Sequence, residues 1–387
     1  MPNHVVQGTL VLAGRLAPAG QVVVEDGLIQ EIVTDGRHYE PTDDYGDAFI
    51  LPGLIDLHVH GIAGADVMDC SQESLDLMAR RFADHGVTGF LPTTVTESLP
   101  ITRQAIASIR HYIDTSPDGW ARALGIHLEG PFINQEFKGM QNPAYILHPD
   151  EEIARDLISC GGGYVTRVSL APEMPRADSV IRLLRDQGIY VSIAHTAASY
   201  DQVLDAIRLG ATHVTHCFNA MTGLHHRRPG VAGASMLCDD LYTELIPDGI
   251  HIHPAVMRLL IRIKGRERVM LVTDSMSAAD MPDGLYQFGG QEVTVRDGDA
   301  RLADGTLASS TLTMDAAVRN LVQLCQVPLT DAAYMASTTP ADAMGLGRTR
   351  GKLAVGYDAD LAVLDAALRP VATWVAGEQC VVVRAAG

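Results

Sequence analysis

Two histidines separated by a single residue stand in the apolar segment "IDLHVHG" at residues 55–61. Side chains alternate between the two faces of a β-strand, so His58 and His60 would share one face with Asp56 while the aliphatic residues between them point the other way. Imidazole is a common ligand of zinc and iron in proteins. A pair of imidazoles on one face, immediately before a glycine, therefore predicts a metal site at the end of this strand.

Five further apolar segments end in residues that could bind a metal or transfer a proton. These endings are Glu129, His195, His216, the pair Asp248 and His251, and Asp274. Each has a simpler explanation on its own, since a histidine after an apolar run is usually a core or loop residue and an aspartate often caps a helix or a turn. Six such endings among eight candidate strands instead favour one shared metal site.

The elements that must position these residues alternate along the chain. β-prone apolar runs lie near 55–59, 87–91, 123–128, 165–170, 189–194, 212–215, 242–246 and 268–272, and amphipathic stretches separate most of them. Repeats of about 30 residues have the size of βα units. Eight of them predict an α/β fold, a (β/α)8 TIM-like barrel, in which active sites gather at the C-terminal ends of the strands.

The two ends of the chain have a different texture, with short β-prone runs interrupted by Gly, Pro and Asp-Gly turns. We predict that residues 1–52 and 350–387 pair into a small β-sandwich domain. Residues 53–349 would form the barrel, with a β-hairpin insertion near 283–308 in a stretch rich in glycine and aspartate.

Composition limits the classes of partner. The 387 residues carry 47 acidic against 29 basic side chains, a net charge of −18, and no Lys/Arg stripe, which argues against a nucleic-acid surface but not against a small anionic substrate. Six cysteines without CxxC spacing are typical of reduced thiols in the cytoplasm. There is no signal-peptide pattern and no apolar run of membrane-spanning length, so we expect no membrane partner.

Several motifs extend the interpretation beyond the metal site. The chain contains, in this order, "PGLIDLHVHG", "GIHLEGPF", "THCFNAM", "HHRRPG", "DGIHIHP", "LVTDSM" and "DGTLASSTLTM". Together they resemble the N-acetylglucosamine-6-phosphate deacetylases of the metal-dependent amidohydrolase superfamily. The likeness runs from about residue 50 to "GYDADLAVLD" near the C-terminus. The His-x-His pair indicates only the superfamily, whereas "HLEGPF" with "NAM" and the Arg-Pro-Gly loop is more specific.

The resemblance implies one or two divalent metals per chain. Glu129, His195 and His216 would bind the main metal, and His58 and His60 would bind a second, weaker one with Glu129 bridging. Zinc is the expected metal, with iron, manganese or cobalt as alternatives.

The resemblance also implies a reaction. A metal lowers the pKa of its bound water from about 15.7 to about 7, and the resulting hydroxide would attack the acetamide carbonyl of N-acetyl-D-glucosamine 6-phosphate. Asp274 would take the proton of the water and deliver it to the departing amine. The products would be acetate and D-glucosamine 6-phosphate, a step of amino-sugar catabolism.

The candidate substrate contacts are Met140, Gln141, Asn219, Ala220, Arg227, Asp248, His251, Leu307, Ala308 and Ser309. Within this set, Arg227 and His251 are directed to the phosphate, since the planar fork of arginine suits that group. Without the resemblance, the "HHRRPG" loop that contains Arg227 would be interpreted as a solvated basic loop. Relatives are commonly homodimers, and the same loop could reach the phosphate site of a partner.

Two positions depart from the family pattern, so the pattern does not decide which sugar is the substrate. Gln141 stands where some members have a histidine proposed to polarise the amide carbonyl, and Ser309 stands where we would expect glycine. One alternative is the same reaction on N-acetylgalactosamine 6-phosphate. Two others are an amidohydrolase acting on another N-acyl or cyclic amide and a catalytically inactive barrel, whose signature would be lost ligands.

Overall fold

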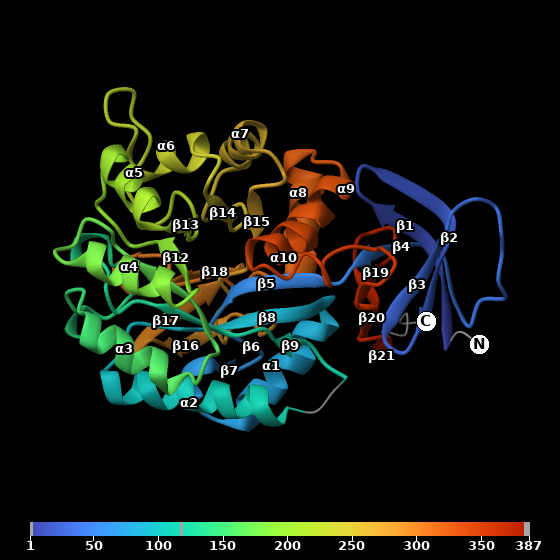
Figure 1. Cartoon of the computed structure of the whole chain (residues 1–387), viewed down its shortest axis with the longest axis horizontal. Coiled ribbons are helices and arrows are strands. Elements are labelled where there is room, and N and C mark those ends of the chain that lie inside the picture. Colours follow the sequence, from blue (N-terminus) through green and yellow to red (C-terminus); the bar gives the residue numbers. More distant parts are fainter. Residues whose placement is uncertain (1–2, 117–118, 383–387) are drawn as a thin grey trace.

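The computed structural model describes residues 3–116 and 119–382. A parallel barrel with helices between its strands occupies most of the molecule, and a separate sheet built from both chain ends lies to one side of it (Figure 1). The predicted fold class, a barrel with a small β-domain from the two ends, is confirmed.

Eight strands follow one another around the barrel. They are β5 (Leu54–Val59), β8 (Val87–Thr94), β10 (Ile126–Glu129), β11 (Val165–Leu170), β12 (Tyr190–Ile193), β13 (Ala211–Val214), β14 (Tyr242–Leu245) and β15 (Val269–Leu271), with the short β9 (Arg122–Ala123) beside β8. Each pairs in parallel with the next. The first and last strands meet through the backbone beyond β15, where the N–H of Asp274 donates to the carbonyl of His58 at 2.9 Å. The barrel is therefore nearly closed, and a closing bond lies at the predicted metal site.

Helices surround the barrel. They are α1 (Gln72–Asp84), α2 (Leu99–Thr115), α3 (Glu151–Cys160), α4 (Ala177–Asp186), α5 (Tyr200–Leu209), α6 (Gly230–Leu237), α7 (Pro254–Lys264), α8 (Met314–Cys325), α9 (Leu329–Ala333) and α10 (Thr339–Ala343), with 3-10 turns at Val67–Asp69, Gln135–Phe137 and Pro143–Tyr145 and a π-helical turn at Tyr334–Thr338. Side-chain caps fix where some of them begin. Ser71 accepts from the N–H of Ser74 at the start of α1, and Ser199 accepts from the N–H of Gln202 at the start of α5.

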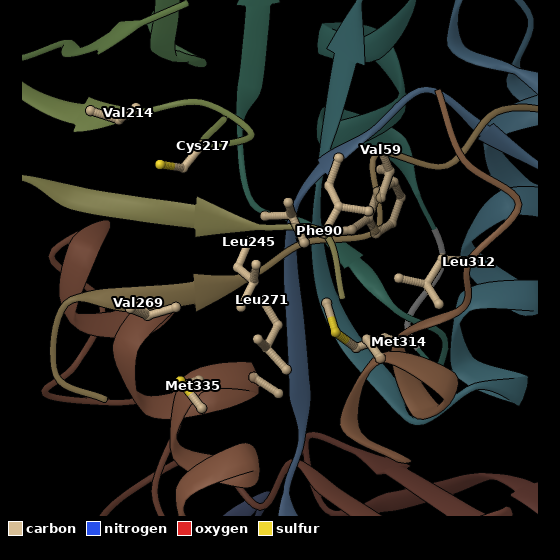
Figure 2. Close-up of a cluster of buried hydrophobic side chains, with 14 of the residues drawn as sticks. Val59, Phe90, Val214, Cys217, Leu245, Val269, Leu271, Leu312, Met314 and Met335 are labelled. Carbon is tan, nitrogen blue, oxygen red and sulfur yellow. The ribbon is translucent and has the colours of Figure 1, made fainter. Parts of the chain in front are cut away.

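The largest hydrophobic core fills the space between strands and helices. Figure 2 shows part of it, including Val59 of β5, Leu245 of β14 and Leu271 of β15. On β5, Ile55 and Leu57 pack in a cluster with residues of α10. Because alternate side chains of this strand pack outward on a helix, the intervening side chains face the barrel interior. Burial of each such aliphatic side chain contributes about 1.5–3 kcal/mol to folding.

The sheet of the chain ends has seven strands in the order β21-β20-β19-β4-β1-β2-β3. They are β1 (His4–Leu12), β2 (Arg15–Glu25), β3 (Leu28–Val33), β4 (Asp43–Pro52), β19 (Leu361–Leu364), β20 (Pro370–Val375) and β21 (Glu378–Val382). Antiparallel pairing of β4 with β19 joins the two ends of the chain. This sheet has its own core, which includes Ile50, Leu361 and Trp374.

Small antiparallel sheets border the site. After β15 the chain forms β16 (Gly284–Phe288), β17 (Gln291–Arg296) and β18 (Asp299–Arg301), and a cluster of buried side chains packs them against Met140 and Ala308. After His60 the chain turns through β6 (Gly61–Ile62) and β7 (Ala65–Asp66), where a Cβ on Gly61 would overlap the carbonyl oxygen of Ala65. Among the described residues, the helices are too short or too polar to cross a membrane.

Candidate active site

The predicted metal ligands converge at the C-terminal end of the barrel strands. The Nε2 atoms of His58 and His60 lie 3.3 Å apart, and those of His195 and His216 lie 3.2 Å apart. Glu129 lies between the pairs. Its Oε1 is 3.2 Å from Nε2 of both His195 and His216, and its Oε2 is 3.5 Å from Nε2 of His60. One carboxylate thus spans both groups, as a bridging ligand would.

The backbone is held in an unusual conformation where three of these side chains emerge. His195, His216 and Asp274 have φ angles of 43°, 30° and 49°. Residues with a Cβ rarely adopt this left-handed region, and each such position costs about 1–3 kcal/mol unless its surroundings impose it. Such strain is concentrated at functional sites. Here it directs three side chains at strand ends toward the same place at the end of the barrel.

Two of the imidazoles, those of His60 and His195, are oriented so that Nε2 carries a lone pair in the neutral ring. Nδ1 of His60 donates to the carbonyl of Thr93 at 3.0 Å, and Nδ1 of His195 donates to the carbonyl of Phe137 at 2.9 Å. A carbonyl oxygen only accepts, so in the neutral ring Nδ1 carries the proton and Nε2 does not. Lone pairs that meet at about 3 Å repel unless a cation or a proton lies between them.

The donor set therefore fits divalent metal ions. Two groups have ligand atoms that all lie within 4.8 Å of one another, one made of His58, His60 and Asp274 and the other of Glu129, His195 and His216. All six side chains are buried. Imidazole with carboxylate is the donor combination of catalytic zinc sites and also suits iron and manganese.

The carboxylates at the centre stay ionised despite their burial. Burial alone would raise the pKa of Glu129, but the charge of His58 and the hydrogen bonds from His195 and His216 hold it well below its usual value. Burial would likewise raise the pKa of Asp274, and His58 and His60 lower it. Both groups are therefore carboxylates at neutral pH, which is the form that binds a cation or accepts a proton.

Asp274 lies between the imidazoles and an open cavity. Its Oδ1 is 3.2 Å from Nε2 of His60, and the hydroxyl of Ser309 donates to the same oxygen at 3.3 Å. The N–H of Ser310 donates to the Asp274 carbonyl at 2.8 Å, which places the 307–309 segment beside the aspartate. The Asp274 carboxylate is therefore open both to the ligand groups and to the cavity.

The cavity has a volume of about 320 Å³. Predicted residues that line it are Glu129, Met140, Gln141, His195, His216, Asn219, Ala220, His251, Asp274, Leu307 and Ser309. It is also lined by Gly139, Arg301 and Thr306, which the sequence analysis missed. The volume lies at the lower end of the range, about 300–1,000 Å³, that is typical of small-molecule sites.

Some predicted residues lie outside the cavity lining. His58 and His60 are buried beside it, and Ala308 is fully buried. Asp248 does not line the cavity but contacts a residue that does, since its Oδ2 is 2.6 Å from Nδ1 of His251. Burial would lower the pKa of His251, but the bond to Asp248 raises it.

Arg227 lies elsewhere in the described chain. It is exposed and lines a second cavity of about 600 Å³ together with His225 and Arg228. Its Nη1 is 2.8 Å from Nε2 of His226. The structure of one chain thus does not bring Arg227 to the cavity that contains Asp274.

Gln141, one of the two departures noted above, is fixed at the centre. Its Nε2 donates to Glu129 Oε2 at 2.6 Å, and its Oε1 accepts from the N–H of Thr96 at 2.8 Å. The Gln141 amide is therefore bonded directly to the carboxylate that lies between the two ligand groups.

Two charged residues beneath the site were also missed. Glu244 on β14 and Arg167 on β11 are fully buried and form an ion pair, and Glu244 Oε2 is 3.0 Å from Nδ1 of His58. Burial would raise the pKa of Glu244, but Arg167 and His58 hold it well below its usual value. The available signal was a single charged letter inside the apolar strands "YTEL" and "VTRVSL". Arg301 lies in a polar hairpin, where a single charged residue does not stand out from its neighbours in the sequence.

The amidohydrolase family matches residues 49–384. The chain is 40% identical over 361 residues to N-acetylglucosamine-6-phosphate deacetylase from Bacillus subtilis, covering 92% of this chain and 91% of that protein. It is 42% identical over 335 residues to N-acetylgalactosamine-6-phosphate deacetylase from Escherichia coli O157:H7, covering 86% and 88%.

A solved structure also resembles the fold over almost its full length. It is a mutant N-acetyl-D-glucosamine-6-phosphate deacetylase from Mycobacterium smegmatis in complex with N-acetyl-D-glucosamine-6-phosphate. The TM-score is 0.93 at 31% identity, covering 98% of this chain and 99% of that chain.

Proposed function

The chain belongs to the amidohydrolase family, and from this we propose that it hydrolyses the acetamide bond of N-acetyl-D-glucosamine 6-phosphate, releasing acetate and D-glucosamine 6-phosphate. One observation carries the proposal. A single cavity joins Asp274 and the Glu129–His195–His216 group to two basic side chains, His251 and Arg301. That arrangement suits a substrate with an amide to cleave and a phosphate to bind.

The two ligand groups define the part of the site where the acetamide bond would be cleaved. We propose that Glu129, His195 and His216 hold the main metal and that His58 and His60 hold a second, with Asp274 beside it. Zinc is the metal that best matches these donors, and when bound it would supply hydroxide at neutral pH and polarise the acetyl carbonyl. Gln141 restrains Glu129 through the 2.6 Å bond to its Oε2.

Asp274 carries the proton. A C–O bond forms to the acetyl carbon, the C–N bond breaks, and one proton must move from the attacking water to the leaving nitrogen. The Asp274 carboxylate takes that proton and then gives it to the amine, so that the sugar leaves as a neutral amine. The hydroxyl of Ser309 steadies the aspartate by donating to Oδ1.

The phosphate end combines residues of one chain with one from a partner. His251, held by Asp248, and Arg301 are the basic groups that this chain itself brings to the cavity. We propose that the protein is a homodimer in which Arg227 of one chain reaches the phosphate bound to the other. The exposure of Leu224 (55%) and Leu237 (63%), in the loop with Arg227 and in α6, supports an interface there.

We propose that the enzyme acts in the cytoplasm in the breakdown of amino sugars. The six cysteines are free, as in proteins of a reducing compartment.

N-acetylgalactosamine 6-phosphate is a second candidate substrate. The relative from Escherichia coli O157:H7 that carries this name is 42% identical to the chain. The two sugars differ in the orientation of one hydroxyl, and Ser309 contributes a hydroxyl to the lining of the cavity.

The test is acetate release from a panel of substrates. Metal-loaded enzyme should act fastest on N-acetyl-D-glucosamine 6-phosphate, and kcat/KM for the unphosphorylated sugar should be lower by at least about tenfold. A higher kcat/KM on the galacto substrate would assign the second function, and no acetate from either sugar phosphate would reject both.

A further inference from the structure

We propose that Glu244, paired with Arg167, is a positioning residue that sets the metal-binding geometry of both ligand groups from beneath the site. Glu244 lies on β14 and Arg167 on β11, and neither side chain is exposed. Neither lines the catalytic cavity. Any effect on the reaction must therefore act through the residues that they contact.

A single carboxylate oxygen of Glu244 contacts one member of each ligand group. Oε2 accepts from Nδ1 of His58 at 3.0 Å and from the backbone N–H of His216 at 2.9 Å. The backbone carbonyl of Glu244 also accepts from the N–H of Cys217 at 3.0 Å. The left-handed turn that aims His216 into the site is thus fixed on both sides by the same residue.

The bond to His58 decides which ring nitrogen is free. A carboxylate only accepts, so Nδ1 of His58 carries a proton, and in the neutral ring that a metal binds, Nε2 is left with its lone pair. That Nε2 lies 3.5 Å from both Glu129 Oε1 and Asp274 Oδ1. Glu244 thereby holds His58 in the tautomer and orientation that a metal ligand needs.

Arg167 explains why an unprotonated carboxylate is tolerated so deep in the barrel. Its guanidinium forms an ion pair with Oε1 of Glu244 and also donates to the hydroxyls of Ser192 at 3.1 Å and Thr215 at 3.4 Å. An unpaired buried charge is very unfavourable, and the arginine supplies the opposite charge beside the glutamate. A glutamine at this place would have to turn its amide N–H either toward Arg167 or toward both Nδ1 of His58 and the backbone N–H of His216.

A buried ion pair can also be purely structural, so the test needs a matched control. Asp315 provides one, because it is a buried carboxylate that contacts His85 Nδ1 at 2.9 Å and Arg319 at 3.1 Å without contacting a ligand group. Neutralising either carboxylate should lower the melting temperature. Only the change at Glu244 should alter metal binding.

The experiment measures zinc binding and does not require turnover. Wild type, Glu244→Gln and Asp315→Asn are stripped with a chelator, and zinc occupancy is titrated by competition with a chelating dye. We expect Glu244→Gln to weaken zinc binding at both ligand groups by about 10- to 100-fold and Asp315→Asn to leave both affinities unchanged. Wild-type affinities in Glu244→Gln, or equal weakening in both variants, would overturn the proposal.

A second measurement covers the case in which Glu244→Gln does not fold. In the metal-free wild type, at a pH high enough that His58 carries a single proton, long-range ¹H–¹⁵N NMR of labelled histidines reports each tautomer. The His58 signals are assigned by their loss in His58→Gln. We expect His58 with its proton on Nδ1, and a proton on Nε2 instead would refute the role of Glu244. The inference rests on the proposed metal-dependent function, but failure to release acetate would reject that function while leaving the zinc affinities and the tautomer to decide this proposal.

Discussion

Replacing Asp274 with asparagine removes the proton carrier and the negative charge beside His58 and His60 while keeping the size of the side chain. Asparagine has the same shape and can still accept from the Ser309 hydroxyl, which donates to Oδ1 at 3.3 Å. Glu129, His195 and His216 keep all their contacts, so at least one metal should remain bound. Positioned acid–base groups contribute about 10²- to 10⁴-fold to turnover. At about 1.36 kcal/mol per tenfold, this corresponds to about 2.7–5.4 kcal/mol of activation free energy.

We therefore expect kcat of Asp274→Asn to fall by at least about 100-fold. The change in KM should be smaller, because the phosphate end of the cavity is untouched. Acetate release at saturating substrate measures kcat, and elemental analysis of the same sample measures metal content. Asp283→Asn, which neutralises an exposed carboxylate beside β16, is the control and should retain full activity. An Asp274→Asn enzyme that keeps more than about a tenth of wild-type kcat would refute the role of Asp274.

The remaining predictions concern the second metal, the phosphate and the pH dependence of stability. The double change His58→Gln, His60→Asn should reduce the metal content from two ions per chain to one and slow turnover, and unchanged stoichiometry in elemental analysis would contradict the two-metal site. Arg301→Ala should lower kcat/KM on the 6-phosphate by about ten- to a hundredfold, the loss of a charge-assisted contact, and leave the unphosphorylated sugar nearly unaffected, whereas equal losses on both would remove Arg301 from the phosphate site. Arg227→Ala should show the same selectivity without dissociating the dimer in size-exclusion chromatography, and a monomeric variant would mean that Arg227 serves assembly instead. Burial would lower the pKa of His85, but its aspartate partner raises it, so the pair stabilises the fold fully below the unfolded pKa of about 6.5 and loses this contribution as pH rises through the folded pKa. The difference in Tm between wild type and His85→Gln should accordingly be larger at pH 6 than at pH 9, and an equal difference at both would contradict the pairing.

The barrel and its metal ligands could be predicted because both depend on local pattern. Each barrel strand is a short apolar run, and the parallel arrangement brings all their C-terminal ends together. The residue that follows each run, such as His195 or Asp274, therefore lies at the site whatever the detailed register. The alternation in β5 likewise indicated which side chains face inward.

The remaining features depend on contacts between segments that are distant in the sequence. The pairing of Glu244 with Arg167 requires that β14 and β11 meet across the barrel interior, which no local pattern encodes. Arg301 reaches the cavity because three short strands fold over the mouth, and their placement depends on packing against Met140 and Ala308. The loop that carries Arg227 projects from the surface, so its role depends on a second chain.

The central claim is that this site cleaves an acetamide bond of a phosphorylated amino sugar. The most direct measurement is a product balance, in which zinc-loaded enzyme is incubated with N-acetyl-D-glucosamine 6-phosphate and acetate and primary amine are quantified together by NMR. We expect equal amounts of acetate and D-glucosamine 6-phosphate, with no products after the metal is removed and recovery when zinc is returned. Release of inorganic phosphate in place of acetate, or acetate release that persists without metal, would contradict the account.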